Sequence, residues 1–237
     1  MRGRRRFRIL EALAEKGGGG DVTTARLCEV SRRVTGVTGA GILLMSDDVP
    51  LGSVCTANDV SALIENLQYT LGEGPCIDAY RLGKPVLEPD LADPAEPRWL
   101  GFTGPAVDAG VRAIFGFPIA VGSVHLGVLN LYMDTAGPLT DDQHADALVM
   151  AEIAGQVVLV MQTECSDDTS LAAELEEGSD FHYVVHQAAG MVSAQLEVSV
   201  GQALVRLRAH AFASERALDG VAADVVARRL RFTDEAA

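Results

Sequence analysis

Residues 113–132 read AIFGFPIAVGSVHLGVLNLY, and this stretch decides the fold of most of the chain. Two apolar runs rich in β-branched and aromatic residues, 113–121 and 124–132, flank the dipeptide Gly122-Ser123. A glycine-containing pair between two such runs is typical of a two-residue turn that joins antiparallel strands. The stretch therefore predicts a β-hairpin at the centre of a sheet.

Further strands and helices are predicted on both sides of this hairpin. Runs at 39–46 and 51–56 are separated by the turn residues Asp47 and Asp48, and they predict a second strand pair. A short strand is expected at 84–88, and helices at 21–34, 59–69 and 102–109. A longer helix begins at the capping box of Thr140 and Gln143 and extends to residue 163. This order predicts an α+β domain, an antiparallel sheet with helices packed on it.

The last fifth of the chain has a different pattern. Residues 181–230 predict three short helices, the second of which begins with the capping box of Ser199 and Gln202. The third helix ends in Arg228, Arg229 and Arg231. So short a segment buries too little apolar surface to be robust alone. We therefore expect a small helical head held by the larger domain.

The composition indicates a soluble globular protein. Of its 237 residues, 48% are hydrophobic and 22% are charged. No apolar run approaches the roughly 18–20 residues of a membrane span. Glu11 and Glu15 interrupt what would be the apolar core of a secretion signal. We expect a cytoplasmic protein that does not contact membranes.

The net charge of −14 argues against a general nucleic-acid binder, but the charge is unevenly distributed. Residues 1–20 carry six basic and two acidic side chains. Residues 21–180 carry seven basic and 25 acidic side chains. Residues 181–237 carry six of each, and all six basic ones are arginine. Arginine suits phosphates and base edges because its guanidinium group is a planar fork of donors. Nucleic-acid binding would then depend on a few specific contacts in the head.

The cysteines and histidines predict neither a metal site nor a cofactor. The cysteines at positions 28, 55, 76 and 165 are widely spaced and form no Cys-x-x-Cys motif. In a chain of this length they fit reduced thiols better than a disulfide framework or a zinc site. No Ser/His/Asp or paired-carboxylate pattern stands out, so we do not expect an enzyme.

Three segments of the larger domain resemble GAF domains, which are small-ligand sensors. They are LGEGPCIDAYRLGKPV (71–86), GVRAIFGFPI (110–119) and LGVLNLYMDTAGPLTDDQ (126–143). The resemblance implies a pocket for an unknown small ligand. Its expected lining is Cys76, Trp99, Phe102, Phe115, Phe117 and Tyr132. Cys76 follows a proline at an expected helix start, where a thiolate is favoured.

The head resembles an ANTAR domain, the RNA-binding module of bacterial transcription antiterminators. The similarity lies in VHQAAGMVSAQLEVSVGQALVRLRAHAF (185–212), followed by Leu218 and Val221-Ala222. The family commonly has lysine where this chain has Ala189, which removes one expected cation near RNA. The residues that the resemblance implies for RNA binding are Gln187, Ala188, Gly190, Met191, Arg206, Arg208 and His210.

Four parts are expected in the chain. They are a flexible basic segment (1–20), a GAF-like domain (21–163), an acidic linker or helix (164–180) and an ANTAR head (181–237). In the long helix, residues 149, 153, 157 and 160 have near-heptad spacing, which favours pairing with a second copy in a homodimer. The alternative is that this face packs only on the chain's own sheet.

The function implied by the two resemblances is transcription antitermination. A GAF sensor would respond to a signal, and an ANTAR head would bind RNA stem-loops in nascent mRNA. One alternative is a DNA-binding regulator with a helix-turn-helix in residues 199–230. A second, less favoured alternative is a GAF-type redox enzyme that uses Cys55 or Cys76.

Overall fold

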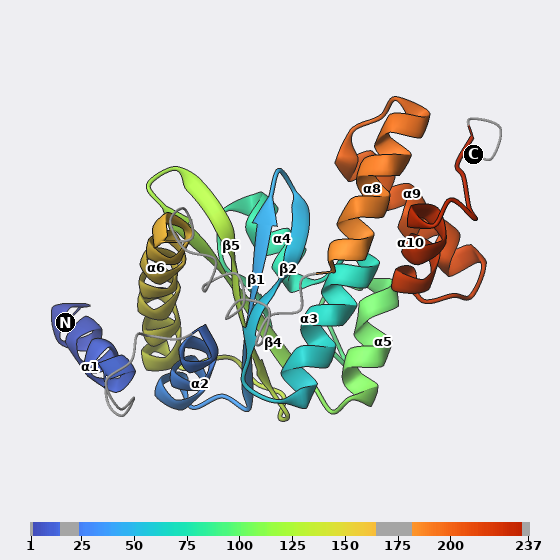
Figure 1. The fold of residues 1–237 in the computed structure, drawn as a ribbon. Coiled ribbons are helices and arrows are strands. Elements are labelled where there is room, and N and C mark those ends of the chain that lie inside the picture. The colour runs from blue at the N-terminus through green and yellow to red at the C-terminus, as the bar shows by residue number, and fades with distance from the viewer. Residues whose placement is uncertain (1, 15–23, 165–181, 234–237) are drawn as a thin grey trace.

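A five-stranded antiparallel sheet forms the centre of the larger domain (Figure 1). The computed structural model describes residues 2–14, 24–164 and 182–233, with the backbone alone for 24, 25 and 161–164. Residues 165–180 of the predicted linker lie outside this part. In the order β2-β1-β5-β4-β3, each strand pairs antiparallel with its neighbour. The strands are β1 (Gly39–Ser46), β2 (Val49–Thr56), β3 (Val86–Glu88), β4 (Ala113–Val121) and β5 (Val124–Met133).

The predicted hairpin is confirmed as β4 and β5. Val121 pairs with Val124, and Gly122 between them has a φ of 62°, in the left-handed region that glycine adopts most readily. The turn between β1 and β2 uses Asp47 and Asp48 at φ values of 48° and 63°. Aspartate tolerates this conformation better than most residues, which explains its presence at both turn positions.

Helices cover both faces of the sheet, as the α+β prediction requires. They are α2 (Thr24–Thr35), α3 (Asp59–Leu71), α4 (Pro75–Leu82), α5 (Leu100–Asp108) and α6 (Asp141–Glu164). Helices α2 and α6 enclose one buried cluster, which contains Phe115 and Leu131. Helices α3, α4 and α5 enclose a second cluster on the opposite face, which contains Phe102 and Tyr132. We call residues 24–164 the sheet domain.

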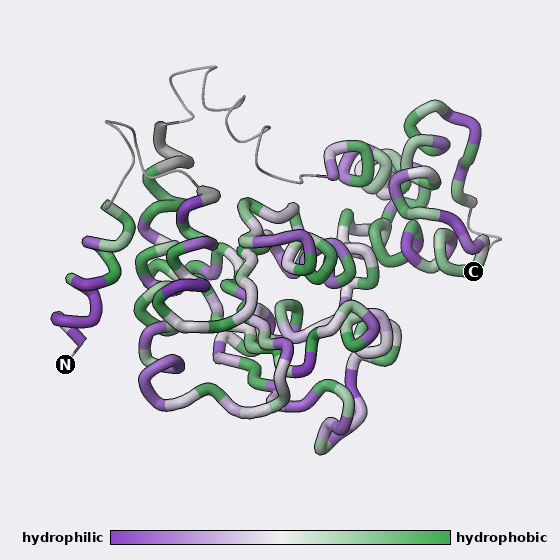
Figure 2. The backbone as a smooth tube through the Cα atoms, turned by 90° about the horizontal axis from the view of Figure 1, so that it is seen from below, coloured by the Kyte–Doolittle hydropathy of each residue, from purple (hydrophilic) through white to green (hydrophobic). Residues whose placement is uncertain are grey.

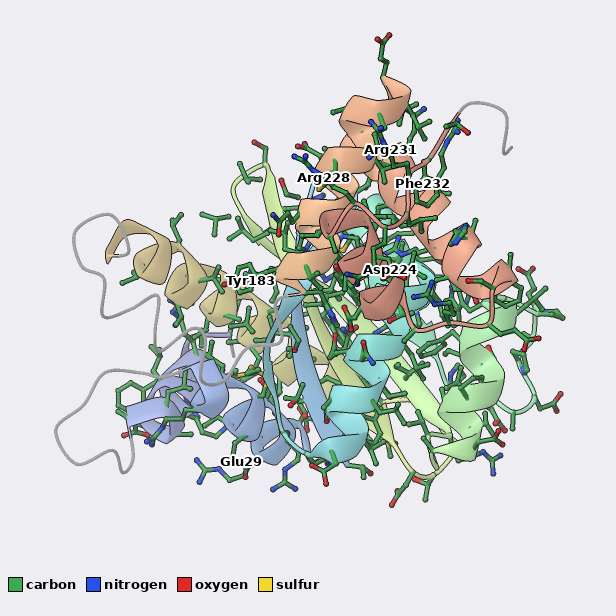
Figure 3. The ribbon with its side chains drawn as sticks, turned by 45° about the vertical axis from the view of Figure 1, so that its right-hand side comes forward. Glu29, Tyr183, Asp224, Arg228, Arg231 and Phe232 are labelled. Carbon is green, nitrogen blue, oxygen red and sulfur yellow. A yellow bond between two sulfur atoms is a disulfide. The ribbon has the colours of Figure 1, made fainter. Side chains whose placement is uncertain are left out.

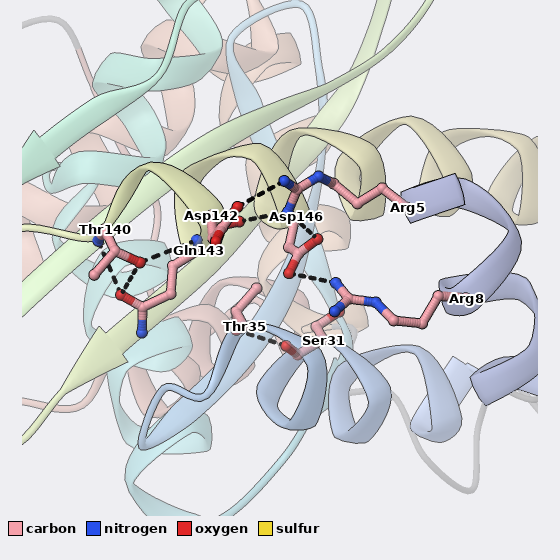
Figure 4. A network of polar contacts seen from close by, with 8 residues as sticks. All are labelled: Arg5, Arg8, Ser31, Thr35, Thr140, Asp142, Gln143 and Asp146. Carbon is pink, nitrogen blue, oxygen red and sulfur yellow. Dashed lines mark hydrogen bonds and ion pairs between the residues drawn. The ribbon is translucent and has the colours of Figure 1, made fainter. Parts of the chain in front are cut away.

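The basic N-terminal segment forms a helix, α1 (Arg2–Ala14), that packs against α6. Its first turns are hydrophilic (Figure 2). Arg5 and Arg8 both contact Asp146 of α6, and Arg5 also contacts Asp142 (Figure 4). Arg5 and Arg8 therefore neutralise acidic residues of the same chain. The predicted capping box of α6 is confirmed, since Gln143 accepts from the backbone of Thr140 at 2.9 Å.

The near-heptad face of α6 packs largely on the chain's own core. Val149 and Ile153 are 4% and 2% exposed and belong to the cluster beneath α6. Val157 packs partly against the same cluster, whereas Val160 is 53% exposed. The first half of this face is therefore already occupied within one chain.

A disulfide between Cys28 and Cys55 joins α2 to β2. The expectation of reduced thiols is wrong for this pair. The two residues are 27 positions apart in sequence, but the packing of α2 on β2 brings their Cα atoms to 6.0 Å. That distance is the usual one for a disulfide, and it depends on tertiary packing that spacing alone does not reveal. Cys76 is a free, buried thiol.

The predicted helical head is present as α8 (Tyr183–Leu196), α9 (Val200–Ala213) and α10 (Leu218–Val226). These helices bury a separate apolar cluster built mainly from their own residues. The predicted capping box of Ser199 and Gln202 is confirmed at the start of α9. We call residues 182–233 the helical head.

Among the helices that the structure describes, none has the length and apolar character needed to cross a membrane.

Candidate functional site

The helical head is attached to the sheet domain through Tyr69 at the end of α3. The ring of Tyr69 stacks on His182, with centroids 3.9 Å apart and planes 16° apart. Tyr69 is only 1% exposed and belongs to the apolar cluster of the head. One aromatic residue of the sheet domain is therefore part of the core of the head.

A second contact joins α8 to the edge strand β2. Nε2 of His186 lies 2.7 Å from the carbonyl oxygen of Leu51. Because a carbonyl only accepts, this nitrogen carries the proton and donates it. The pairing of β1 with β2 is irregular between Leu44 and Met45, whose partners are Gly52 and Pro50, so Leu51 is the extra residue of a bulge. Because Leu51 has no partner in β1, its carbonyl oxygen can accept the hydrogen bond from His186 of the head.

Arg208 of α9, one of the seven residues expected to bind RNA, makes the third contact. Its guanidinium group donates to the carbonyl oxygen of Tyr69, at the C-terminal end of α3. The carbonyl ends of a helix carry partial negative charge, which favours a cation there. Burial nevertheless lowers the pKa of Arg208 to about 10. Within the described residues no carboxylate pairs with it, and its buried Nε has no hydrogen-bond partner.

Gly72 provides the space that Arg208 occupies. It ends α3 in the left-handed conformation, with a φ of 67°. A Cβ atom at this position would lie 2.5 Å from Nη1 of Arg208. Glycine is therefore favoured here both by the left-handed end of the helix and by the close approach of the guanidinium group.

The seven residues expected at an RNA surface do not share one face. Gln187, Gly190 and Met191 lie on one side of α8 at helical spacing; the first two are exposed and Met191 is partly buried. A Cβ at Gly190 would meet nothing within 4 Å, so this glycine leaves open space and is not a packing contact. Ala188 is fully buried in the core of the head, and so is Ala189, where the ANTAR family commonly has lysine.

The remaining expected residues lie on α9 and point in different directions. Arg208 is directed at the sheet domain, as described above. His210 lies against Phe232 of the C-terminal segment, with ring centroids 5.4 Å apart. Arg206 is one turn before His210 on the same helix and is partly exposed. The structure thus brings Arg206 and His210 together but separates them from Arg208.

The residues that sequence reasoning did not select are those after α10. Arg228 and Arg231 are exposed, and Phe232 is fixed against α8 and α9 (Figure 3). The sequence shows these arginines as the end of the third helix. It gives no sign that the chain turns back there onto α8.

The six residues expected to line one ligand pocket lie on two faces of the sheet. Phe115 and Phe117 are buried beneath α2 and α6. The other four, Cys76, Trp99, Phe102 and Tyr132, are buried beneath α3, α4 and α5. Side chains alternate between faces along a strand, and Phe115 pairs with Leu131 while Ile114 pairs with Tyr132. The six side chains therefore cannot surround a single ligand.

Two ionisable groups are buried on the α3 face of the sheet. Burial raises the pKa of Glu65 to about 8, although Asn130 donates to both its carboxyl oxygens at 2.9 Å. Burial, followed by the nearby Glu65, also raises the pKa of Cys76. A thiolate at Cys76 was expected because a helix start favours negative charge. The cost of burying that charge outweighs this effect, so the thiol form is favoured.

A small cavity of about 60 Å³ lies where the sheet domain meets the head. Its lining includes Glu65 and Tyr69 of α3 and His182 of the head. A second, more open cavity of about 450 Å³ lies between the β1–β2 turn and β5, beside Tyr80 and His125. None of the six expected pocket residues lines either cavity. Within the described residues, no group of three or more potential metal ligands is present.

These features define a two-part protein whose α+β domain contacts a helical head through the end of α3 and the edge strand β2. The sequence matches the GAF domain family over residues 21–162. The chain therefore belongs to the GAF domain family, whose members commonly sense signals in regulators. A search of curated proteins finds no match to the chain.

Solved structures share the fold of the sheet domain. The GAF domain of an Acinetobacter phosphoenolpyruvate-protein phosphotransferase is 12% identical, with a TM-score of 0.51. The match covers 70% of this chain and 98% of that one. The corresponding domain from Coxiella burnetii is also 12% identical, with a TM-score of 0.50, and the match covers 70% and 96% of the two chains. At this identity the likeness concerns the fold alone.

Proposed function

We propose that the chain is an RNA-binding transcription antitermination regulator. The GAF domain senses a small signal, and the helical head is an ANTAR module that binds paired stem-loops in nascent mRNA. As a homodimer it captures two stem-loops and holds the RNA in a form that excludes the terminator hairpin. The protein acts by binding, without catalysis or a cofactor, in the cytoplasm.

The observation that carries this proposal is the contact of Arg208 with the end of α3. Arg208 belongs to the segment that resembles ANTAR domains, and the sheet domain holds it through the carbonyl of Tyr69. Glu65, one turn before Tyr69 on α3, lines the cavity at the junction. A shift of the C-terminal end of α3 would therefore move the carbonyl group to which Arg208 donates. A signal that favours a second arrangement of the head would shift the population toward molecules with an accessible Arg208.

The DNA-binding alternative is less well supported by the head. A recognition helix presents polar side chains to base edges. Helix α10 instead directs Leu218, Val221 and Val225 into the core. Asp219 of the same helix is exposed and would repel DNA phosphates. Stem-loop RNA, whose unpaired bases can approach a surface of small residues such as Gly190, fits this head better.

The redox alternative is also less well supported. Cys55 is held in the disulfide with Cys28. Cys76 is fully buried and its pKa is raised, so little reactive thiolate is present near neutral pH.

Binding of the full chain to three probes tests the proposal at a single salt concentration. The probes are an RNA with two tandem stem-loops, an RNA with one, and a DNA duplex of equal length. We expect the tandem RNA to bind most tightly. Replacing Arg208 by alanine should weaken that binding about tenfold, the typical value of one charge-assisted contact. Arg4→Ala, at an exposed position of α1, is the control. Equal or tighter binding of the DNA duplex would favour the alternative regulator.

A further inference from the structure

The segment after α10 is held across the other two helices of the head. The backbone N–H groups of Arg229 and Leu230 both donate to the carbonyl of Asp224, which reverses the chain direction. The N–H of Phe232 then donates to Oε1 of Gln195 on α8 at 2.9 Å. The Phe232 ring also packs edge-on against His210 of α9. Contacts with α8, α9 and α10 therefore fix the positions of residues 228–232.

Arg228 lies at the turn in a strained backbone conformation. Its φ of 58° is in the left-handed region, where a residue with a Cβ atom is uncommon. A glycine would relieve this strain. The chain instead has an arginine whose side chain is exposed.

The charges around this turn are unevenly compensated. Asp224 pairs with both Arg216 and Arg229, at 2.6 and 2.7 Å. Within the described residues, no ion pair forms with Arg206, Arg228 or Arg231. The carboxylate nearest to the turn in sequence is thus shared by two other arginines. The sequence continues with Asp234 and Glu235, which lie outside the described residues.

Arg228 and Arg231 are on the side of the head away from the sheet domain. Figure 3 shows Arg228, Arg231 and Phe232 at the outer part of the head, while Tyr183 lies close to the sheet. Figure 1 places the C-terminal segment on the same outer side. Both arginines are therefore accessible while Arg208 remains bound to the end of α3.

We propose that Arg228 and Arg231 form a phosphate-binding surface for stem-loop RNA that operates while the head is docked, together with Arg206, which is one helical turn before the His210 ring that packs on Phe232. This inference rests on the proposed RNA-binding function and names residues for it that the ANTAR resemblance did not supply, apart from Arg206. The guanidinium groups contact backbone phosphates, so the surface adds affinity and orientation and reads no base sequence. Phe232 and Gln195 position the two arginines of the turn.

The salt dependence of RNA binding tests this surface. Each phosphate contact steepens the slope of log K against log salt by about 0.7 to 0.9. The double variant Arg228→Gln/Arg231→Gln of the full chain should therefore have a slope shallower by about 1.5, and about tenfold weaker binding near physiological salt. The matched control is Arg4→Gln/Lys84→Gln, which removes the same charge from exposed positions of α1 and the sheet domain. Its slope should stay close to that of the wild type.

The outcomes separate this inference from the function on which it rests. If the wild type binds the tandem RNA and the double variant keeps its slope, the surface assignment is wrong and the proposed function stands. An equal decrease of RNA affinity and salt slope in the double variant and the control would also overturn the surface assignment. The net charge of the protein would then explain the effect in both variants. If the wild type binds no RNA, both proposals fail. Thermal unfolding checks that the variants fold, and Arg228→Lys/Arg231→Lys should retain the wild-type slope.

Discussion

At the scale of single residues, Glu65 is the most strongly perturbed carboxyl group in the structure's described part. It is 2% exposed, and its one side-chain donor, Asn130, does not offset the cost of burying a charge. The neutral form is therefore favoured in the folded protein up to a pH of about 8. In the unfolded chain the same group loses its proton near its ordinary pKa.

This difference predicts a stability that depends on pH. Between the unfolded and folded pKa values of Glu65 the folded state binds more protons, so stability is greatest below the unfolded value and falls as the pH rises toward 8. The loss should reach up to about 4 kcal/mol. Glu65→Gln should remove this dependence and be more stable than the wild type at pH 8. Urea unfolding of the wild type and of Glu65→Gln at pH 5, 6, 7 and 8 measures the free energy of unfolding of each. If the two proteins showed the same change of stability with pH, Glu65 would not be its cause.

The elements on which residues lie could be predicted more easily than the contacts that their side chains make. The sequence identifies Arg208 as a candidate for a specific contact, but it does not show that the partner is the carbonyl of Tyr69. The hydrogen bond between Arg208 and Tyr69 joins residues 139 positions apart, so it depends on how two folded units meet. The burial of Glu65 has the same origin, because Asn130 of β5 lies 65 positions away.

At the scale of secondary structure, the disulfide between α2 and β2 links two elements that are adjacent in the fold. Cross-linking residues 27 positions apart restricts the unfolded chain and should contribute about 3 kcal/mol to stability. Unfolding of the wild type in denaturant should therefore shift to lower concentration when a reductant is added. The variant Cys28→Ala/Cys55→Ala should show no such response. An identical midpoint for the wild type with and without reductant would mean that the bond does not form in solution.

Most elements could be predicted because their signals are local. The β4–β5 hairpin follows from two apolar runs on either side of Gly122-Ser123, and α6 and α9 begin at capping boxes visible in the sequence. Which face each strand residue occupies was the weaker inference. Phe115 and Tyr132 are both aromatic and both buried, but the register places them under different helices. An aromatic count alone could not assign them to one pocket.

At the scale of the whole molecule, the two parts have separate cores. The two apolar clusters of the sheet domain contain no residue of the head. From the sheet domain, the cluster of the head includes Tyr69, and the partly buried Val49 packs against it. Each part therefore buries most of its apolar surface without the other. The contact between them consists of a few polar groups around the Tyr69 ring, together with Val49.

Deleting residues 181–237 should leave a folded sheet domain that no longer binds the tandem RNA. The far-ultraviolet circular dichroism should keep its sheet contribution, and unfolding should remain cooperative because both sheet-domain clusters are intact. The melting temperature should fall by a few degrees, since Tyr69 becomes exposed, a loss of about 1–2 kcal/mol. RNA binding by the truncated chain would show that the head is not the binding module.

The position of the head over strand β2 has a consequence for solubility. β2 is at the end of the sheet, and the bulge at Leu51 directs a carbonyl group outward that His186 satisfies. Edge strands with unpaired backbone groups are templates for intermolecular strand addition. Under the proposed function, a molecule whose head moves away from β2 would expose such a template, so the RNA that it binds would have to cover this edge to prevent strand addition between molecules.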